Sequence, residues 1–129
     1  MIAVDTAAVV AIVLGELEAE AFLAVIEREH SILSAASMSE AAIVVEARQG
    51  PDATRDLQTL IDAAIEIVPF DQEHSRSAFA AWKRFGKGRH PAALNLGDCY
   101  SYATASIAGV PLLFKGTDFT QTDIESALG

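Results

Sequence analysis

Short apolar runs alternate with longer amphipathic segments along this chain, and this alternation limits its possible folds more than any other feature. Each run is long enough for a strand but too short for a helix. Its near-continuous apolar character is typical of a strand that is covered on both faces. Four such runs are therefore predicted to be strands, over residues 2–4, 31–34, 65–70 and 111–114.

The segments between these runs are predicted to be helices, because their apolar residues recur at helical spacing. Asp71 and Asn95 are suitable N-caps, while Gly50 and Gly109 are typical helix stops. Strands that alternate with helices predict one α/β domain over residues 1–129, with a parallel sheet flanked by helices. The predicted helices are 7–14, 16–29, 35–49, 52–64, 72–85 and 96–108, followed by a polar loop at 116–122 and a short terminal helix or edge strand.

The chain is acidic, with 18 Asp and Glu residues against nine Lys and Arg, and a formal net charge of −9. Such a charge argues against binding of nucleic acid over a broad basic surface. No apolar run reaches the roughly 18–20 residues that span a bilayer, and the N-terminus lacks the basic region of a signal peptide. One cysteine, Cys99, excludes an internal disulfide framework and a cysteine zinc site. We therefore expect a soluble cytoplasmic protein with no membrane partner.

Acidic residues lie where side chains from distant segments can meet. Asp5 follows the first predicted strand, and Glu40 lies in the helix after the second. Asp98 opens the helix before the fourth strand, and Asp118 lies just beyond that strand. In open α/β sheets the working crevice lies beyond the carboxyl ends of the strands. Carboxylates gathered there repel one another unless a cation neutralises them, and Mg²⁺ or Mn²⁺ suits such oxygen ligands. Such a centre activates water for attack on a phosphodiester.

Each acid also has a purely structural interpretation. Asp5 would cap the helix that follows it, and Glu40 fits a Ser-x-x-Glu capping box. Asp98 would simply favour the dipole of its helix, whereas Asp118 and Asp123 would be solvated loop acids. No acid is decisive alone, so the joint placement of the first four carries the metal-site hypothesis.

Four segments together give the chain a family resemblance. A strand ends in Asp5 with small residues behind it, a small-residue helix contains Glu40, and a second such helix opens on Asp98. The segments are Val4-Asp5-Thr6-Ala7-Ala8, residues 36–44, Leu96-Gly97-Asp98-Cys99-Tyr100-Ser101-Tyr102-Ala103 and residues 112–119. Their order and spacing resemble the PIN-domain family, and most closely the VapC toxins of type II toxin–antitoxin systems, nearly from end to end.

The resemblance implies a PIN-like three-layer sandwich with a central parallel sheet of four to five short strands. It also implies a Mg²⁺-dependent endoribonuclease that a VapB-type antitoxin neutralises. Asp5 and Asp98 would then be the most direct metal ligands, and Glu40 would orient or deprotonate the attacking water. Thr6 would hydrogen-bond within this site, or simply serve as a hydroxyl at the helix start. The same resemblance implies a homodimer, an antitoxin tail docked against the early helices, and DNA contact only through the antitoxin.

The fourth acidic position departs from the family pattern. Gly116 stands where many members have an acid, two residues before Asp118. Asp118 would replace that acid as a ligand or lie behind the ligands, and Asp123 is a more distant candidate. This departure leaves open a catalytically degenerate PIN domain that only binds partners.

Residues 74–97 contain five of the nine basic residues and no acid. Lys83 and Arg84 suit a helix C-terminus, but the helix dipole does not require Lys87 and Arg89. We expect Lys87 and Arg89 to contact the RNA backbone, and Lys115 is a further candidate for phosphate contact. Trp82 beside this patch would pack in a core or a dimer, or would stack on a base.

The main rival from another class is a receiver-like signalling domain. It shares the size, the parallel sheet, the acid Asp5 after the first strand and a late lysine, Lys115. Its phospho-accepting aspartate would have to be Asp71, which instead suits a helix cap. Paired acids after the first strand are also missing, because Thr6 follows Asp5.

Overall fold

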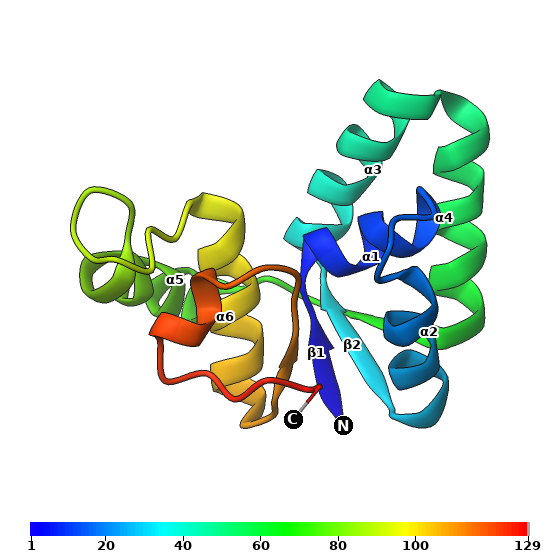
Figure 1. Ribbon diagram of the computed structural model, residues 1–129. Coiled ribbons are helices and arrows are strands. Elements are labelled where there is room, and N and C mark those ends of the chain that lie inside the picture. Colours follow the sequence, from blue (N-terminus) through cyan, green and yellow to red (C-terminus); the bar gives the residue numbers. More distant parts are fainter. Residues whose placement is uncertain (129) are drawn as a thin grey trace.

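A computed structural model describes residues 1–128 and shows one parallel sheet with helices on both faces (Figure 1). The strands lie in the order β3-β2-β1-β4, and every pairing is parallel. This arrangement confirms the predicted three-layer α/β sandwich. The strands are β1 (Ile2–Val4), β2 (Ser31–Ser34), β3 (Ile65–Val68) and β4 (Leu112–Leu113).

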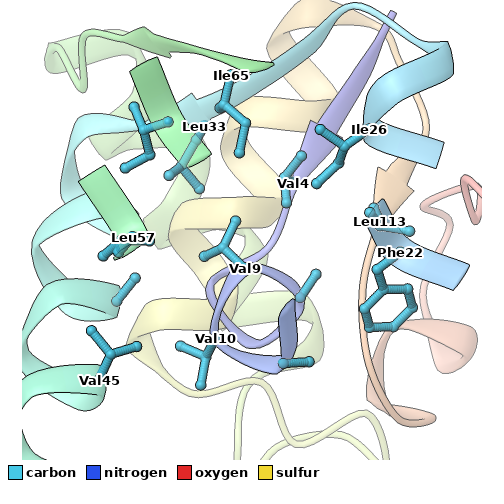
Figure 2. Close-up of a cluster of buried hydrophobic side chains, with 14 of the residues drawn as sticks. Val4, Val9, Val10, Phe22, Ile26, Leu33, Val45, Leu57, Ile65 and Leu113 are labelled. Carbon is cyan, nitrogen blue, oxygen red and sulfur yellow. The ribbon is translucent and has the colours of Figure 1, made fainter. Parts of the chain in front are cut away.

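Alternate strand residues face two separate hydrophobic clusters, as the two-residue repeat of a strand requires. Val4, Leu33 and Leu113 point into the cluster beneath the first four helices (Figure 2), whereas their neighbours Ile32 and Leu112 face the last two. Both faces of the sheet are therefore covered at β1, β2 and β4, which explains the near-continuous apolar runs, whereas Glu66 of the edge strand β3 stays exposed. The first layer holds α1 (Thr6–Val13), α2 (Ala19–Arg28), α3 (Ala35–Gln49) and α4 (Pro51–Ala64), and the second α5 (Gln72–Phe85) and α6 (Leu96–Ala108).

Several element boundaries differ from the predicted ones; β4, for example, covers only Leu112–Leu113 of the predicted residues 111–114. Helix α2 begins at Ala19 rather than residue 16, because the backbone of Gly15 turns through a positive φ of 67° and residues 16–18 complete the turn. Strand β3 ends before Pro69, which has no N–H to donate to a neighbouring strand. The expected polar loop contains a short 3₁₀ helix, η1 (Asp118–Gln121).

The C-terminal segment lies along the free edge of β4. Leu112 donates its N–H to the Glu125 carbonyl at 2.9 Å and accepts from the Ala127 N–H at 2.9 Å. A parallel bridge joins Leu112 to Ser126. These bonds agree with the edge-strand alternative for the terminal residues and protect an otherwise open sheet edge.

The topology itself selects one end of the sheet for a ligand. From β1 the chain proceeds outward through β2 and β3, and then returns to the other side of β1 to form β4. In open α/β sheets ligands bind at such a switch point, beyond the carboxyl ends of the strands. Asp5 directly follows β1 at this point. Within residues 1–128, no helix has the length and apolar character needed to cross a bilayer.

Candidate active site

A cleft of about 280 Å³ opens at the switch point of the sheet. Three of the four predicted acids line it, and each comes from a different element: Asp5 from the end of β1, Glu40 from α3 and Asp98 from α6. The structure therefore brings together carboxylates that are up to 93 residues apart in the chain. The other polar residues of the wall are Thr6, Glu16, Arg48, Asn95 and Lys115.

Asp5 is the most buried of these acids, with 3% of its surface exposed. One oxygen, Oδ2, accepts the Ala7 backbone N–H at 3.2 Å, so Asp5 caps α1 as its structural interpretation predicts. The other oxygen, Oδ1, accepts the Ser101 hydroxyl of α6 at 2.5 Å. Asp5 thus both caps α1 and lines the cleft, because its two oxygens have separate partners.

Burial and the negative charges of Asp98 and Glu40 together raise the pKa of Asp5 to about 7, against the opposing effect of the Ser101 and Ala7 hydrogen bonds. A carboxyl group in this position is costly to ionise, since it leaves water and approaches like charges. A cation between the acids would remove both penalties. The electrostatics of the cleft therefore favour a positively charged ligand.

Asp98 forms a reciprocal capping box at the start of α6. Its own N–H donates to Oδ1 of Asn95 at 2.8 Å, and its Oδ2 accepts the Asn95 N–H at 3.0 Å. Burial raises the pKa of Asp98, and so do the charges of Asp118 and Glu40. The cap fixes the carboxylate at the cleft rather than removing it from the site.

The capping-box interpretation of Glu40 is wrong, because α3 begins three residues earlier than that box requires. Ser34 is the N-cap, and its hydroxyl accepts the Ala36 N–H at 3.1 Å. Glu40 consequently lies in the second turn, where its carboxylate reaches across to α6. A Cβ added to Gly97 would come within 3.0 Å of both Glu40 oxygens. Gly97 thus makes room for this carboxylate, a role that the sequence alone does not reveal.

The two remaining acids lie outside the cleft wall. Asp118 is exposed in η1, and it acts on the site through charge, because it raises the pKa of Asp98. Asp123 accepts the Tyr102 hydroxyl at 2.6 Å and lies 3.7 Å from an Arg84 nitrogen. It therefore fastens the C-terminal segment to α5 and α6.

Glu16 forms ion pairs with two basic side chains at the cleft mouth. Its place in the sequence did not predict this role. Its Oε1 lies 3.2 Å from the Lys115 ammonium, and its Oε2 lies 3.9 Å from an Arg48 nitrogen. Glu18 lies 3.7 Å from the same ammonium. Lys115 thus lies at the cleft, and Arg48 is a second cation there.

The other two predicted RNA contacts, Lys87 and Arg89, lie away from this cleft. Lys87 lines a separate groove between α5 and α6. Arg89 packs on Trp82, with its guanidinium 4.8 Å from the ring centre. Asn95 lines both the cleft and the groove, so the two are neighbours.

The cleft offers carboxylate oxygens, which are the donors that Mg²⁺ and Mn²⁺ prefer. Within residues 1–128, no group of three or more Asp, Glu, His or Cys side chains is arranged so that it could hold a metal ion as it stands. The donor chemistry and the raised pKa values of Asp5 and Asp98 nevertheless fit a divalent cation at this position.

Comparison with known proteins agrees with this geometry. The PIN-domain family profile matches residues 2–125. Ribonuclease VapC30 of Mycobacterium tuberculosis is 46% identical over 123 residues, which cover 94% of each chain. The chain belongs to the VapC group of PIN-domain proteins. This membership rules out the receiver-like alternative, and Asp71 is indeed the N-cap of α5, where it accepts the His74 N–H.

Solved structures show the same fold in more distant VapC relatives and other toxins. The sarcin–ricin loop cleaving toxin VapC20 of Mycobacterium tuberculosis superposes with a TM-score of 0.79 at 14% identity, over 96% of both chains. A toxin–antitoxin complex from Klebsiella pneumoniae gives a TM-score of 0.69 at 20% identity, over 95% of this chain and 93% of that one. At these identities the likeness concerns the fold.

The raised pKa of Asp5 predicts a pH-dependent stability that Asp5→Asn removes. From about pH 4 to about pH 7 the folded protein keeps this proton while the unfolded chain has released it. Rising pH therefore lowers the free energy of unfolding, by up to about 1.4 kcal/mol per pH unit from this group. Relative to the unmodified protein, Asp5→Asn should gain stability across this range in metal-free buffer.

Urea unfolding at several pH values measures this difference. Asp56→Asn, which changes an exposed acid of α4, is the matched control and should follow the unmodified protein. If the Asp5→Asn curve also runs parallel to that of the unmodified protein, Asp5 does not have the raised pKa on which the cation hypothesis depends.

Proposed function

We propose that this VapC-family protein is a Mg²⁺-dependent endoribonuclease and the toxin of a VapBC-type module. The observation that carries the proposal is the convergence of Asp5, Glu40 and Asp98 on one cleft at the switch point of the sheet. Identity to VapC ribonucleases over most of the chain supports the activity. The site acts in the cytoplasm, where cellular RNA lies.

Asp5 and Asp98 are the proposed metal ligands, and Mn²⁺ is a chemically reasonable substitute for Mg²⁺. When bound, the ion would lower the pKa of a water molecule and stabilise the charge that develops on the phosphate. The Ser101 hydrogen bond and the Asn95 capping box hold the two carboxylates in place before RNA arrives. Asp118 adds negative charge behind Asp98.

Glu40 is the proposed general base, because its carboxylate enters the cleft from the opposite layer of helices. From there it would orient the attacking water and accept its proton. Thr6 also lines the cleft, and its Oγ1 is buried without a hydrogen-bond partner among the described residues. A phosphate oxygen or a water held at the site would satisfy this hydroxyl.

The proposed substrate contacts lie around the acidic centre. Lys115 and Arg48 at the cleft mouth would bind phosphates on either side of the cleavage point. Lys87 and Arg89 would bind the RNA backbone farther along the strand, in the segment that contains no acid. These few cations would guide RNA to a centre that is otherwise repulsive to it.

The proposed protein partners are a VapB-type antitoxin and a second copy of this chain. A related fold in a toxin–antitoxin complex from Klebsiella pneumoniae supports the antitoxin. Leu17, which is 99% exposed in the turn before α2, offers an apolar contact on the layer of early helices. Ile43 on α3 is also well exposed and suits a contact between copies. Contact with DNA would occur only through the antitoxin.

Removing one proposed ligand should abolish cleavage without unfolding the protein. Asp98→Asn keeps an oxygen that can accept the Asn95 N–H, so the capping box can persist. Cleavage of RNA in Mg²⁺ should nevertheless fall by more than about 100-fold, since even an outer-shell partner of a metal is worth about 10–100-fold. Asp123→Asn is the control, because Asp123 lies outside the cleft.

A gel-based cleavage assay with antitoxin-free protein, in Mg²⁺, Mn²⁺ or EDTA, gives the answer. Undiminished cutting by Asp98→Asn would refute the metal site. If the unmodified protein cuts no RNA with either metal, the chain is instead a degenerate PIN domain that only binds partners.

Gly97→Ala should lower RNA cleavage without lowering the stability of the protein. Alanine favours a helix by about 1 kcal/mol over glycine, so the melting temperature should hold or rise. The added Cβ would displace the Glu40 carboxylate, and cleavage should fall roughly tenfold or more. In a Glu40→Ala background the same change should have no further effect on cleavage. Additive losses in this double-mutant cycle would show that Gly97 does not act through Glu40.

Lys87→Ala combined with Arg89→Ala should weaken RNA binding and reduce its salt dependence by about one unit of slope per lost phosphate contact. Arg28→Ala combined with Arg55→Ala removes the same charge from the other helix layer and should leave the slope unchanged. Titrations of labelled RNA at several salt concentrations measure both slopes. Equal slopes for the two double variants would show that Lys87 and Arg89 are not part of the RNA interface.

A further inference from the structure

A groove of about 450 Å³ lies between α5 and α6, next to the acidic cleft. Aromatic side chains line part of its wall, including Phe79 and Trp82 on α5 and Tyr100 on α6, and Lys87 adds a positive charge. Asn95 belongs to this wall and also to the wall of the acidic cleft. A chain that occupies the cleft can therefore continue directly into the groove.

Trp82 is held rigidly although it lies at the surface, with 40% of its area exposed. A Cβ on Gly86 would stand within 3.0 Å of the indole Cδ1 and Nε1, so the ring packs closely against the glycine backbone. The Arg89 guanidinium lies 4.8 Å from the ring centre, and its Nε donates to the Lys83 carbonyl at 3.2 Å. The indole is thus fixed before any ligand binds, which lowers the entropy cost of stacking on it.

Phe79 extends the aromatic surface. It is 61% exposed and nearly parallel to Trp82, with an angle of 14° between the rings and 6.1 Å between their centres. The Lys83 ammonium lies 5.6 Å from the Phe79 ring centre. Other aromatic residues, such as Phe22 and Phe85, are buried in the cores. The exposed pair therefore forms a stacking platform with positive charge at its edge.

The charge around the groove indicates what fills it. Residues 74–97 carry five bases and no acid in a chain whose net charge is −9. In a two-fold dimer built on this groove, the same patch would meet itself and bring its bases together. A strand of nucleic acid instead offers phosphates for the bases and flat rings for the aromatic residues. Charge and shape together favour a single strand over a second copy.

We propose that this groove is a stacking subsite for an unpaired RNA base that flanks the phosphate in the acidic cleft. The proposal rests on the proposed ribonuclease function, and it deepens that function by giving the exposed aromatic pair beside the cleft a role in holding the substrate. Trp82 and Phe79 provide the surface on which the base stacks, and Lys87 binds its phosphate. Stacking of this kind tolerates many sequences, because every base has an aromatic face.

The chain contains a single tryptophan, so intrinsic fluorescence reports on Trp82 alone. Short single-stranded RNA, titrated in EDTA and checked on a gel for integrity, should quench this fluorescence in a saturable way. An abasic ribose-phosphate strand of equal length keeps the phosphates but has no ring to stack, and should quench little. Equal quenching by both strands, or none by either, would overturn the subsite.

Affinities of the variants come from the anisotropy of labelled RNA. Trp82→Ala should raise the dissociation constant roughly tenfold, whereas Trp82→Phe keeps a ring and should stay within about threefold of the unmodified protein. Phe79→Ala, at a more exposed position, should weaken binding in the same direction even if Trp82→Ala folds poorly. Ile107→Ala, at the far end of α6, is the control. The salt slope should not change with either aromatic variant, because no phosphate contact is lost.

The outcomes separate this subsite from the nuclease itself. Unchanged affinity in both alanine variants, with normal cleavage by the unmodified protein, overturns the subsite and leaves the nuclease intact. Quenching by RNA without any cleavage supports the subsite and counts against the nuclease. A fall in mass by light scattering in Trp82→Ala, with unchanged RNA affinity, assigns the groove to a contact between copies and overturns the proposal.

Discussion

A carboxyl group buried at the end of the central strand governs the chemistry of this protein. Asp5 follows β1, which is paired on both sides, and its own N–H donates to the Leu113 carbonyl, so the sheet fixes its backbone. Its oxygens are then held by Ala7 and Ser101. Burial beside Asp98 and Glu40 raises its pKa to about 7, so below about pH 7 the isolated protein keeps a proton where a cation would fit. Ionising Asp5 in the folded protein therefore costs free energy, and binding of a cation would reduce that cost.

The first turns of α6 organise the rest of the site. Asp98 closes the capping box, Gly97 leaves space for the Glu40 carboxylate, and Ser101 donates to Asp5. The same residues therefore shape the start of the helix and the site. This explains why the structural and functional interpretations of Asp5 and Asp98 do not compete: a carboxylate has two oxygens, and a cap needs only one.

Local signals predicted most of the fold. Apolar runs marked the four strands, and Asp71 and Asn95 capped the helices that they were expected to cap. Glu40 shows where local signals mislead, because its Ser-x-x-Glu pattern suggests a helix start while the backbone enters the helix at Ala35. Contacts between distant segments left no local trace. Ser101 lies 96 residues from Asp5, and nothing around either residue indicates that they meet.

The net charge of −9 gives a poor guide to the surface, because acids and bases occupy different regions. Four acids line the cleft, whereas the segment from residue 74 to residue 97 contains bases but no acid and carries the exposed aromatic pair. RNA binding at such a surface cannot rest on many phosphate contacts. In the proposed complex with RNA, binding would combine a cation in the cleft, a few basic side chains and stacking on Trp82, of which only the basic contacts would be strongly screened by salt. A modest salt dependence is therefore the expected signature of this polarised surface.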